Sequence, residues 1–338
     1  RFSHKNEFAR PDYYKVQFDN GTVTELSASR TGAVLDIAFT PGKEQYFIVD
    51  AYHGGCRLAI DKQNRRVTGY TKNNCGGVPS NFANYFVLEF SHPIKDQGIQ
   101  INDDLFPGKL VGEHDRVCAY LQFDVPEGEK LTVRVASSFI GEEQAWLNFD
   151  REVKNKTVAD LKIESAKLWN SMMGRIVAEG GNEEQMKTFY SCLYRVLLFP
   201  REFYEFDKSG KPVYYSPYDG KIHAGYMYTD NGFWDTFRAV HPLFTLVYPE
   251  VSERIMQALV NSYEESGFLP EWASPGHRGC MIGNNSLSLI TDAWMKGIRS
   301  SDAKKALEAM VHQTQAQGRE ASVGRNGFEE YDKLGYVP

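Results

Sequence analysis

The chain has 338 residues, enough for about two domains of ordinary size. Hydrophobic residues make up 42% and charged residues 24%, which is ordinary globular usage and argues against intrinsic disorder or a coiled coil. The net charge is −6 without an extended basic run, and no apolar stretch reaches ~18 residues, so neither a nucleic-acid partner nor a membrane span is expected.

Residues 1 to about 150 contain short runs rich in β-branched and aromatic residues, separated by turn signals. The segment 14–18 alternates apolar and polar side chains, and Asp19-Asn20-Gly21 then supplies residues that tolerate the positive φ of a tight turn. Similar runs recur at 33–39, 46–49, 85–90, 117–123 and 131–137. Because no helical pattern intervenes, we predict an antiparallel β-sandwich over residues 1–150.

The hydrophobic period changes after Asp150. Apolar positions over 158–173 suit a helix, and the Gly180-Gly181 pair follows, so we expect residues 151–181 to form a helical linker. Asn182, with Gln185 three residues later, is a good N-cap for a helix that ends before Pro200. Further helices are expected at about 232–240, 249–265, 286–296 and 302–316. Long loops join them, which favours helical hairpins stacked around a centre over 182–338 rather than a tight bundle.

Two residue types carry further information about the class of protein. The 5 Trp, 19 Tyr and 21 Phe can fill a core, but they can also form flat platforms for ligands with apolar faces. The five cysteines form no Cys-x-x-Cys pair, which argues against a zinc knuckle or a thioredoxin-type site. Free thiols and a disulfide between Cys56 and Cys75 both remain open at this stage.

The first candidate site is the pair Trp234-Asp235, at the opening of a predicted helix. An indole can cover the apolar C–H face of a pyranose, while a carboxylate accepts hydrogen bonds from vicinal hydroxyls. A purely structural interpretation is also open. Asp235 would then stabilise the N-terminus of the helix, and Trp234 would belong to the core.

The second candidate is a loop that joins two predicted helices and contains Glu271-Trp272, His277 and Gly283-Asn284-Asn285. Here too an acid, an indole and amide groups precede a helix. The structural alternative is that Asn285 or Ser286 is only an N-cap and that His277 is a surface residue. The glycine pairs at 54–55 and 76–77 are interpreted as ordinary β-turns, with a contribution to a site at the domain junction as the alternative.

Five segments, in order, resemble the motifs of glycoside hydrolase family 92. The likeness begins at Tyr228–Leu243, which includes Trp234-Asp235-Thr236, and the opening residues 2–14 are similar to the middle of the family's N-terminal β-sandwich. Five ordered motifs are more specific than one, and they extend the resemblance over essentially the whole chain. The other four motifs lie at 267–272, 280–283, 292–297 and 331–338.

The resemblance implies a β-sandwich, a helical linker and the first part of an (α/α)6 toroid. It also implies an inverting exo-α-mannosidase that removes terminal α-linked mannose from N-glycans or yeast-type mannan. The family's calcium ion, Ca2+, is expected to hold two mannose hydroxyls, although no ligands are assigned to it here. By position, Trp234, Asp235, Glu271, Trp272 and the loop Gly283-Asn284-Asn285 are expected to bind the sugar. A secreted, periplasmic or outer-surface location in a bacterium is expected.

The chain also departs from the family pattern. Glu271 stands where many relatives carry Arg, and Asn285 replaces a His, which puts the linkage preference in question. The motifs for the general acid, the general base and the main calcium ligands are expected C-terminal to Pro338, and the first sandwich strands before Arg1. We therefore expect an internal segment that functions with the rest of its own polypeptide and does not hydrolyse glycosides by itself.

Two alternatives remain open at the level of sequence. One is another enzyme on the same scaffold, a glycoside phosphorylase or a glucoamylase-like hydrolase. The other is a non-catalytic glycan-binding module that uses the same aromatic residues.

Overall fold

The computed structural model describes residues 1–281, 283–299, 301–318 and 323–338. Its contacts divide the chain into two compact units. The first unit comprises residues 1–73 and 83–174, and the second comprises 74–82 and 175–338. Within the described residues, no helix is both long and apolar enough to cross a membrane.

The first unit is built on two antiparallel sheets, which confirms the predicted sandwich. The larger sheet has the strand order β1-β2-β3-β4-β13-β8-β7-β6-β11, and the smaller has the order β10-β9-β12-β5. The strands are β1 (Phe2–Arg10), β2 (Tyr13–Phe18), β3 (Val23–Ala28), β4 (Gly32–Ala38), β5 (Gln45–Asp50), β6 (Cys56–Asp61), β7 (Arg66–Thr71), β8 (Asn84–Phe90), β9 (Asp96–Ile101), β10 (Asp104–Pro107), β11 (Val111–His114), β12 (Val117–Phe123) and β13 (Leu131–Ser138).

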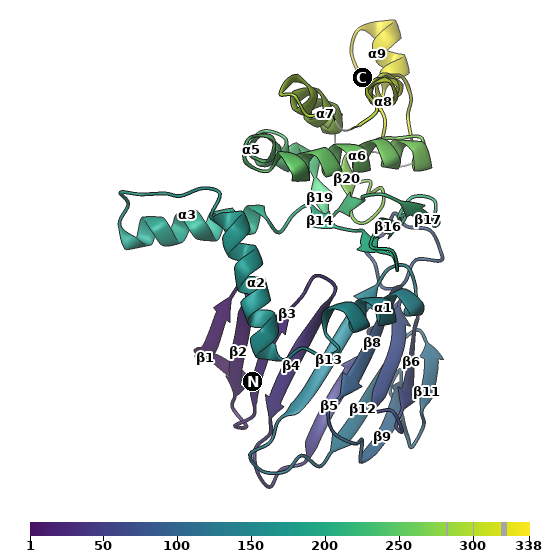
Figure 1. Cartoon of the computed structure of the whole chain (residues 1–338). Coiled ribbons are helices and arrows are strands. Elements are labelled where there is room, and N and C mark those ends of the chain that lie inside the picture. Colours follow the sequence, from purple (N-terminus) through teal and green to yellow (C-terminus); the bar gives the residue numbers. More distant parts are fainter. Residues whose placement is uncertain (282, 300, 319–322) are drawn as a thin grey trace. The chain divides into compact units, whose positions relative to one another are not determined.

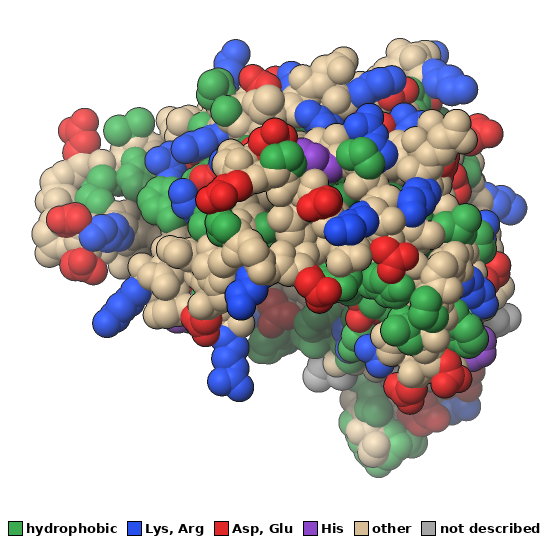
Figure 2. Space-filling view, turned by 90° about the horizontal axis from the view of Figure 1, so that it is seen from below, with side chains coloured by type: hydrophobic (Ala, Val, Ile, Leu, Met, Phe, Trp, Pro, Cys, Tyr) green, Lys and Arg blue, Asp and Glu red, His purple; other side chains and the backbone are tan. Residues whose placement is uncertain are grey.

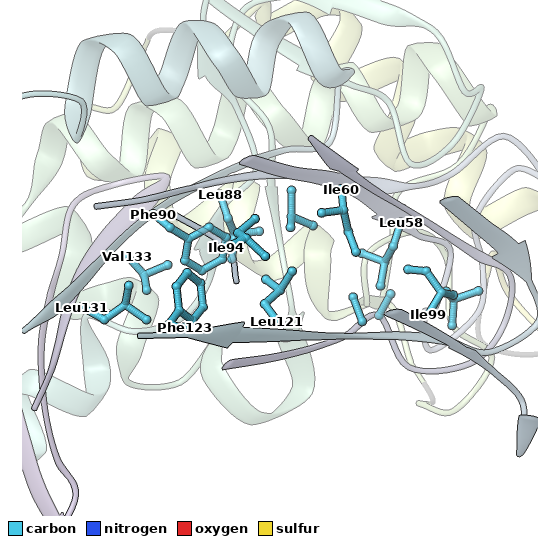
Figure 3. Packing of buried hydrophobic residues seen from close by; sticks show 14 of the residues in the cluster. Leu58, Ile60, Leu88, Phe90, Ile94, Ile99, Leu121, Phe123, Leu131 and Val133 are labelled. Carbon is cyan, nitrogen blue, oxygen red and sulfur yellow. The ribbon is translucent and has the colours of Figure 1, made fainter. Parts of the chain in front are cut away.

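The sandwich core lies between the two sheets. Alternate residues of facing strands point inward, as the period of two requires, and Figure 3 shows Leu88, Phe90 and Val133 of the larger sheet packed with Leu121 and Phe123 of the smaller one. Full burial of each such side chain stabilises the fold by roughly 1.5–3 kcal/mol.

The outer face of the larger sheet is covered by two helices, α1 (Glu142–Glu152) and α2 (Val158–Met173) (Figure 1). Strand residues that alternate with the core positions, such as Val87 and Ala136, pack against Phe149 of α1 and Leu161 of α2. α1 begins at Glu142, whereas a helical pattern is predicted only after Asp150. The central strands of this sheet are therefore covered on both faces, and α1 and α2 belong to the compact sandwich unit.

The second unit is mainly helical, with short antiparallel ribbons between the helices. Its first helix begins at Asn182 with the predicted capping box, in which Asn182 and Gln185 exchange side-chain and backbone hydrogen bonds of 3.0 Å. The elements are α3 (Glu183–Val196), β14 (Arg201–Glu202), β15 (Glu205–Phe206), β16 (Pro212–Tyr215), β17 (Ile222–Ala224), β18 (Tyr228–Thr229), β19 (Asn231–Gly232), α4 (Phe233–Thr236), α5 (Val240–Val247), α6 (Pro249–Ser266), β20 (Trp272–Ala273), α7 (Asn285–Met295), α8 (Ala303–Gln315) and α9 (Phe328–Leu334).

The single helix predicted at about 232–240 is wrong. The chain forms one short helix, α4, breaks near Ala239 and starts α5 at Val240. Pro242 explains the break, because proline has no N–H for a helical hydrogen bond and is tolerated only in the first turn of a helix. The break leaves α4 as a separate turn that carries Trp234 and Asp235.

All five cysteines are free, so the Cys56–Cys75 disulfide does not form. Acidic and basic side chains are interspersed on the face shown in Figure 2.

Candidate functional site

A two-stranded ribbon joins the two sequence clusters that were singled out as candidates. β19 pairs with β20, with Asn231 opposite Ala273 and Gly232 opposite Trp272. The Phe233 N–H also donates a 3.1 Å hydrogen bond to the carbonyl oxygen of Glu271. The segments around Trp234-Asp235 and Glu271-Trp272 are therefore neighbours in space.

Gly232 is the point at which these two segments touch. A Cβ atom built there would lie 2.8 Å from Asp235 Oδ2 and 2.8 Å from Trp272 Cε3, closer than Cβ contacts normally are. Only glycine lets the carboxylate and the indole approach the ribbon in this way. The missing side chain therefore brings Asp235 close to Trp272.

Trp234 is on the surface of α4 with 46% of its area exposed, so the core alternative for this residue is wrong. Arg238 holds it in place, since its guanidinium carbon lies 4.9 Å from the ring centroid and its Nη1 donates a 2.8 Å hydrogen bond to the Trp234 carbonyl. Asp235 is also exposed and makes no capping hydrogen bond with α4. The pair offers solvent an indole and a carboxylate on adjacent residues.

Glu271 is buried, whereas a side chain that contacts a sugar is expected to be exposed to solvent. Its side chain is 1% exposed, and its oxygens accept hydrogen bonds from the first residues of α7. Oε2 accepts from the Asn285 N–H at 2.7 Å, and Oε1 accepts from the Ser286 hydroxyl at 2.7 Å and the Ser286 N–H at 3.3 Å. Burial raises the pKa of Glu271 to about 7, although these donors act in the opposite direction. Glu271 therefore fixes the start of α7 beside β20.

The third predicted segment, Gly283-Asn284-Asn285, is brought to the same place by Glu271. Asn284 occupies the N-cap position of α7 but its side chain makes no capping hydrogen bond, and its Oδ1 is buried without a partner among the described residues. Asn285 and Ser286 are the first two residues of the helix, so the alternative in which either is its N-cap is wrong. The capping role belongs to Glu271, a residue distant in sequence.

A buried polar network behind α4 was not singled out from the sequence as a unit. The Thr236 hydroxyl donates to Asn231 Oδ1 at 2.9 Å, and Asn231 Nδ2 lies 3.4 Å from His241 Nε2. Burial lowers the pKa of His241 to about 4, so this ring is neutral at neutral pH. Thr236 and His241 lie shortly after Asp235 in the sequence, but only the folded chain shows that they support α4 from inside.

The glycine turn at 76–77 is more than an ordinary β-turn. The segment 74–82 belongs to the second unit, where Asn81 donates a 2.8 Å hydrogen bond to the carbonyl of Gly220. A Cβ at Gly276 would lie 1.8 Å from the carbonyl oxygen of Gly77, so the two backbones are in direct contact. This contact braces the loop that follows Trp272. His277, in that loop, donates or accepts a 2.8 Å hydrogen bond with Ser266 Oγ rather than standing free on the surface.

Comparison with known proteins decides the family. Residues 1–138 match the N-terminal domain of glycosyl hydrolase family 92, and residues 144–338 match its catalytic domain. The chain belongs to glycosyl hydrolase family 92.

Solved structures of family 92 agree with this assignment. A family 92 inverting mannosidase of Bacteroides thetaiotaomicron is 62% identical with a TM-score of 0.98, over 100% of this chain and 46% of that one. A family 92 α-mannosidase of the same organism, solved with mannoimidazole, is 26% identical with a TM-score of 0.86, over 100% and 45%. A bacterial glucoamylase, 10% identical with a TM-score of 0.51 over 94% and 51%, shares the fold alone.

Among curated proteins, an uncharacterized secreted glycosidase of Arthroderma benhamiae is 24% identical over 98% of this chain and 42% of its own length. The family 92 chain thus spans less than half the length of this relative and of the Bacteroides mannosidases.

We call Trp234, Asp235 and the Asn284 loop the Trp234 face, and its oxygen donors fit only in part the calcium ion that the family resemblance implies. Calcium takes six to eight oxygen ligands. The exposed carboxylate of Asp235 and the unpartnered Oδ1 of Asn284 are suitable oxygens. Both oxygens of Glu271 are engaged by α7, which removes that carboxylate from the set. This face can therefore supply some calcium ligands, but not a complete shell.

The structure reveals one group that sequence reasoning missed, made of Asp219, His223 and Glu265. One ligand atom of each lies within 4.8 Å of the others. Among the described residues, these three form a group of His, Asp and Glu side chains that could hold a metal ion. These residues line a hollow of about 480 Å3 together with Tyr214, Lys221, Ala224, Asn261 and Glu264. Asp219 and Glu265 lie in segments without a sequence motif.

Proposed function

We propose that this chain forms the mannose-binding part of an exo-α-mannosidase that removes terminal α-linked mannose from N-glycans or yeast-type mannan. The observation that carries the proposal is the exposed Trp234-Asp235 pair, placed beside Trp272 by the β19–β20 ribbon. The two mannosidase structures similar to this chain, one of them described as bound to mannoimidazole, support mannose as the sugar.

The chemistry of the site follows from its side chains. The free part of the Trp234 indole would cover the apolar face of the sugar, and Asp235 would accept hydrogen bonds from two hydroxyls. Glu271 is buried and engaged with α7, so it positions the Asn284 loop rather than contacting the sugar. We assign neither the general acid nor the general base to the described residues and place both C-terminal to Pro338.

Inversion of the anomeric centre is also proposed. It requires an acid and a base about 6.5–9.5 Å apart, with room for water. The similar Bacteroides enzyme described as inverting supports this stereochemistry. Calcium, when bound, would hold two hydroxyls of the mannose and favour a distorted ring. Asp235 and Asn284 are the residues here that would contribute oxygens to it.

The proposal also covers the domain organisation of the chain and the location of the protein. We propose a sandwich over 1–150, a helical linker over 151–181 and the first part of an (α/α)6 toroid over 182–338, functioning with the rest of the polypeptide. The match to a glycosidase described as secreted supports an exported protein. We propose the periplasm or outer surface of a bacterium as its location.

Product analysis tests this function against its alternatives. The full-length enzyme is incubated with an α-linked mannobiose, with and without a calcium chelator, and the first product is followed by NMR. We expect β-mannose that is lost on chelation and restored by calcium. A sugar phosphate would instead establish a phosphorylase. Mannan binding with no product would establish a glycan-binding module and overturn the enzymatic proposal.

Replacement of Trp234 by alanine tests the sugar platform. We expect kcat/KM on mannobiose to fall roughly 10- to 100-fold, because an aromatic platform contributes about 1.4–2.7 kcal/mol to transition-state binding. Trp294→Ala is the matched control, since Trp294 also packs under an arginine, with Arg299 Cζ 4.1 Å from its centroid, but lies at the far end of α7. Equal losses in the two variants would contradict a sugar contact at Trp234.

A further inference from the structure

The group Asp219, His223 and Glu265 in the second unit has the geometry of a metal site. We propose that it binds a divalent transition-metal ion of the zinc type. The proposal does not depend on the mannosidase function, because it is argued from donor atoms that the Trp234 face does not use.

The three side chains come from two structural elements. Asp219 lies in the connection between β16 and β17, and His223 is a residue of β17. Glu265 lies in the last turn of α6. His223 Nε2 lies 3.0 Å from Asp219 Oδ2. A metal ion at this point would link the ribbon to the end of α6.

Each carboxylate has one oxygen anchored by the protein. The Lys221 N–H donates a 2.9 Å hydrogen bond to Asp219 Oδ1, and the Tyr214 hydroxyl donates to Glu265 Oε1. Asp219 Oδ2 faces the imidazole, and Glu265 Oε2 is buried with no hydrogen-bond donor at normal geometry in the described chain. Outer hydrogen bonds that orient one oxygen and leave the other available are typical of metal ligands.

The charge of the group also favours a cation. Two carboxylates face one imidazole, and the ammonium of Lys221, 3.9 Å from Asp219 Oδ2, is 75% exposed and free to move toward solvent. The adjoining hollow of about 480 Å3 has room for the water molecules that would complete the coordination shell.

The donor types distinguish zinc from calcium. Calcium prefers a shell of six to eight oxygens, whereas one imidazole nitrogen with two carboxylates is a set that zinc, cobalt and nickel accept at low coordination number.

Calorimetric titration of the chelator-treated, desalted chain with Zn2+ tests the proposal. We expect one Zn2+ per chain, no competition from calcium at equal concentration, and d–d absorption bands when Co2+ is used instead. In the His223→Ala and Glu265→Gln variants the Zn2+ affinity should fall roughly 100-fold. His92→Ala is the matched control, because His92 Nε2 pairs with Glu129 at 3.1 Å but has no third ligand, and it should bind Zn2+ like the wild type.

Binding of the metal ion to cysteine thiolates is the competing explanation for any Zn2+ or Co2+ that the chain takes up. Cys75, Cys192 and Cys280 are exposed thiols, and Co2+ bound to them would show thiolate charge-transfer bands. The proposal is overturned if the wild type binds no Zn2+, if those bands appear, or if both His223→Ala and Glu265→Gln keep wild-type affinity. Circular dichroism of each variant shows whether it is folded. Because His223 is 34% exposed, its alanine variant remains informative should Glu265→Gln unfold.

Discussion

The Gly276→Ala variant should lose about 3 kcal/mol or more of its free energy of unfolding in the second unit. A Cβ at this position would lie 1.8 Å from the Gly77 carbonyl oxygen and 2.6 Å from that of Pro217. Both atoms are backbone, so no side chain can rotate away to relieve the clash. The segment 74–82 and the loop after Trp272 would have to separate.

Urea denaturation followed by tryptophan fluorescence measures this loss, since Trp272 lies in the affected loop. Gly141→Ala is the matched control, because Gly141 has extended backbone and a Cβ there would meet nothing within 4 Å. The control should unfold like the wild type. A wild-type midpoint for Gly276→Ala would show that the two backbones do not touch as described.

The free energy of unfolding of the wild type, measured relative to that of the Glu271→Gln variant, should fall by roughly 3 kcal/mol as the pH rises from about 4.5 to 7. Burial raises the pKa of Glu271 from 4.5 to about 7, so between these values the folded state holds a proton that the unfolded state has lost. The free energy of unfolding therefore decreases with rising pH through this window and levels off above pH 7. Glutamine cannot ionise and lacks the effect.

Denaturation curves of both proteins across this pH range give the difference directly, because the other titrating groups cancel. A difference that stays constant with pH would mean that the donors from α7 keep Glu271 ionised throughout. A difference that grows with pH would reverse the proposed sign.

Much of the fold could be predicted from local patterns. Alternation marked strands such as β12, and the Asn182 capping box fixed the start of α3. What local patterns missed depends on distant contacts. α1 is helical because Phe149 packs on the outer face of the larger sheet, and the two-residue strands β19 and β20 exist only as partners of each other.

Some residues of the candidate site could be predicted from the sequence, whereas others could not. Trp234 and Asp235 could be singled out because an exposed indole beside a carboxylate suits a sugar, and the structure does leave both exposed. Glu271 could not be assigned from sequence, because its burial and its hydrogen bonds to α7 arise from the tertiary fold. Asp219 and Glu265 are far apart in sequence and become neighbours only when the β16–β17 connection meets the end of α6.

The contact between Gly77 and Gly276 also limits how the chain can be dissected. A polypeptide that started at residue 175 would contain every helix from α3 onward, yet it would lack the segment 74–82 that packs within the same unit. The loop that follows Trp272 would then lose its contact with Gly77, and Gly220 would lose its hydrogen bond from Asn81. The helical unit can thus be exchanged between relatives only together with this short insert from the sandwich half.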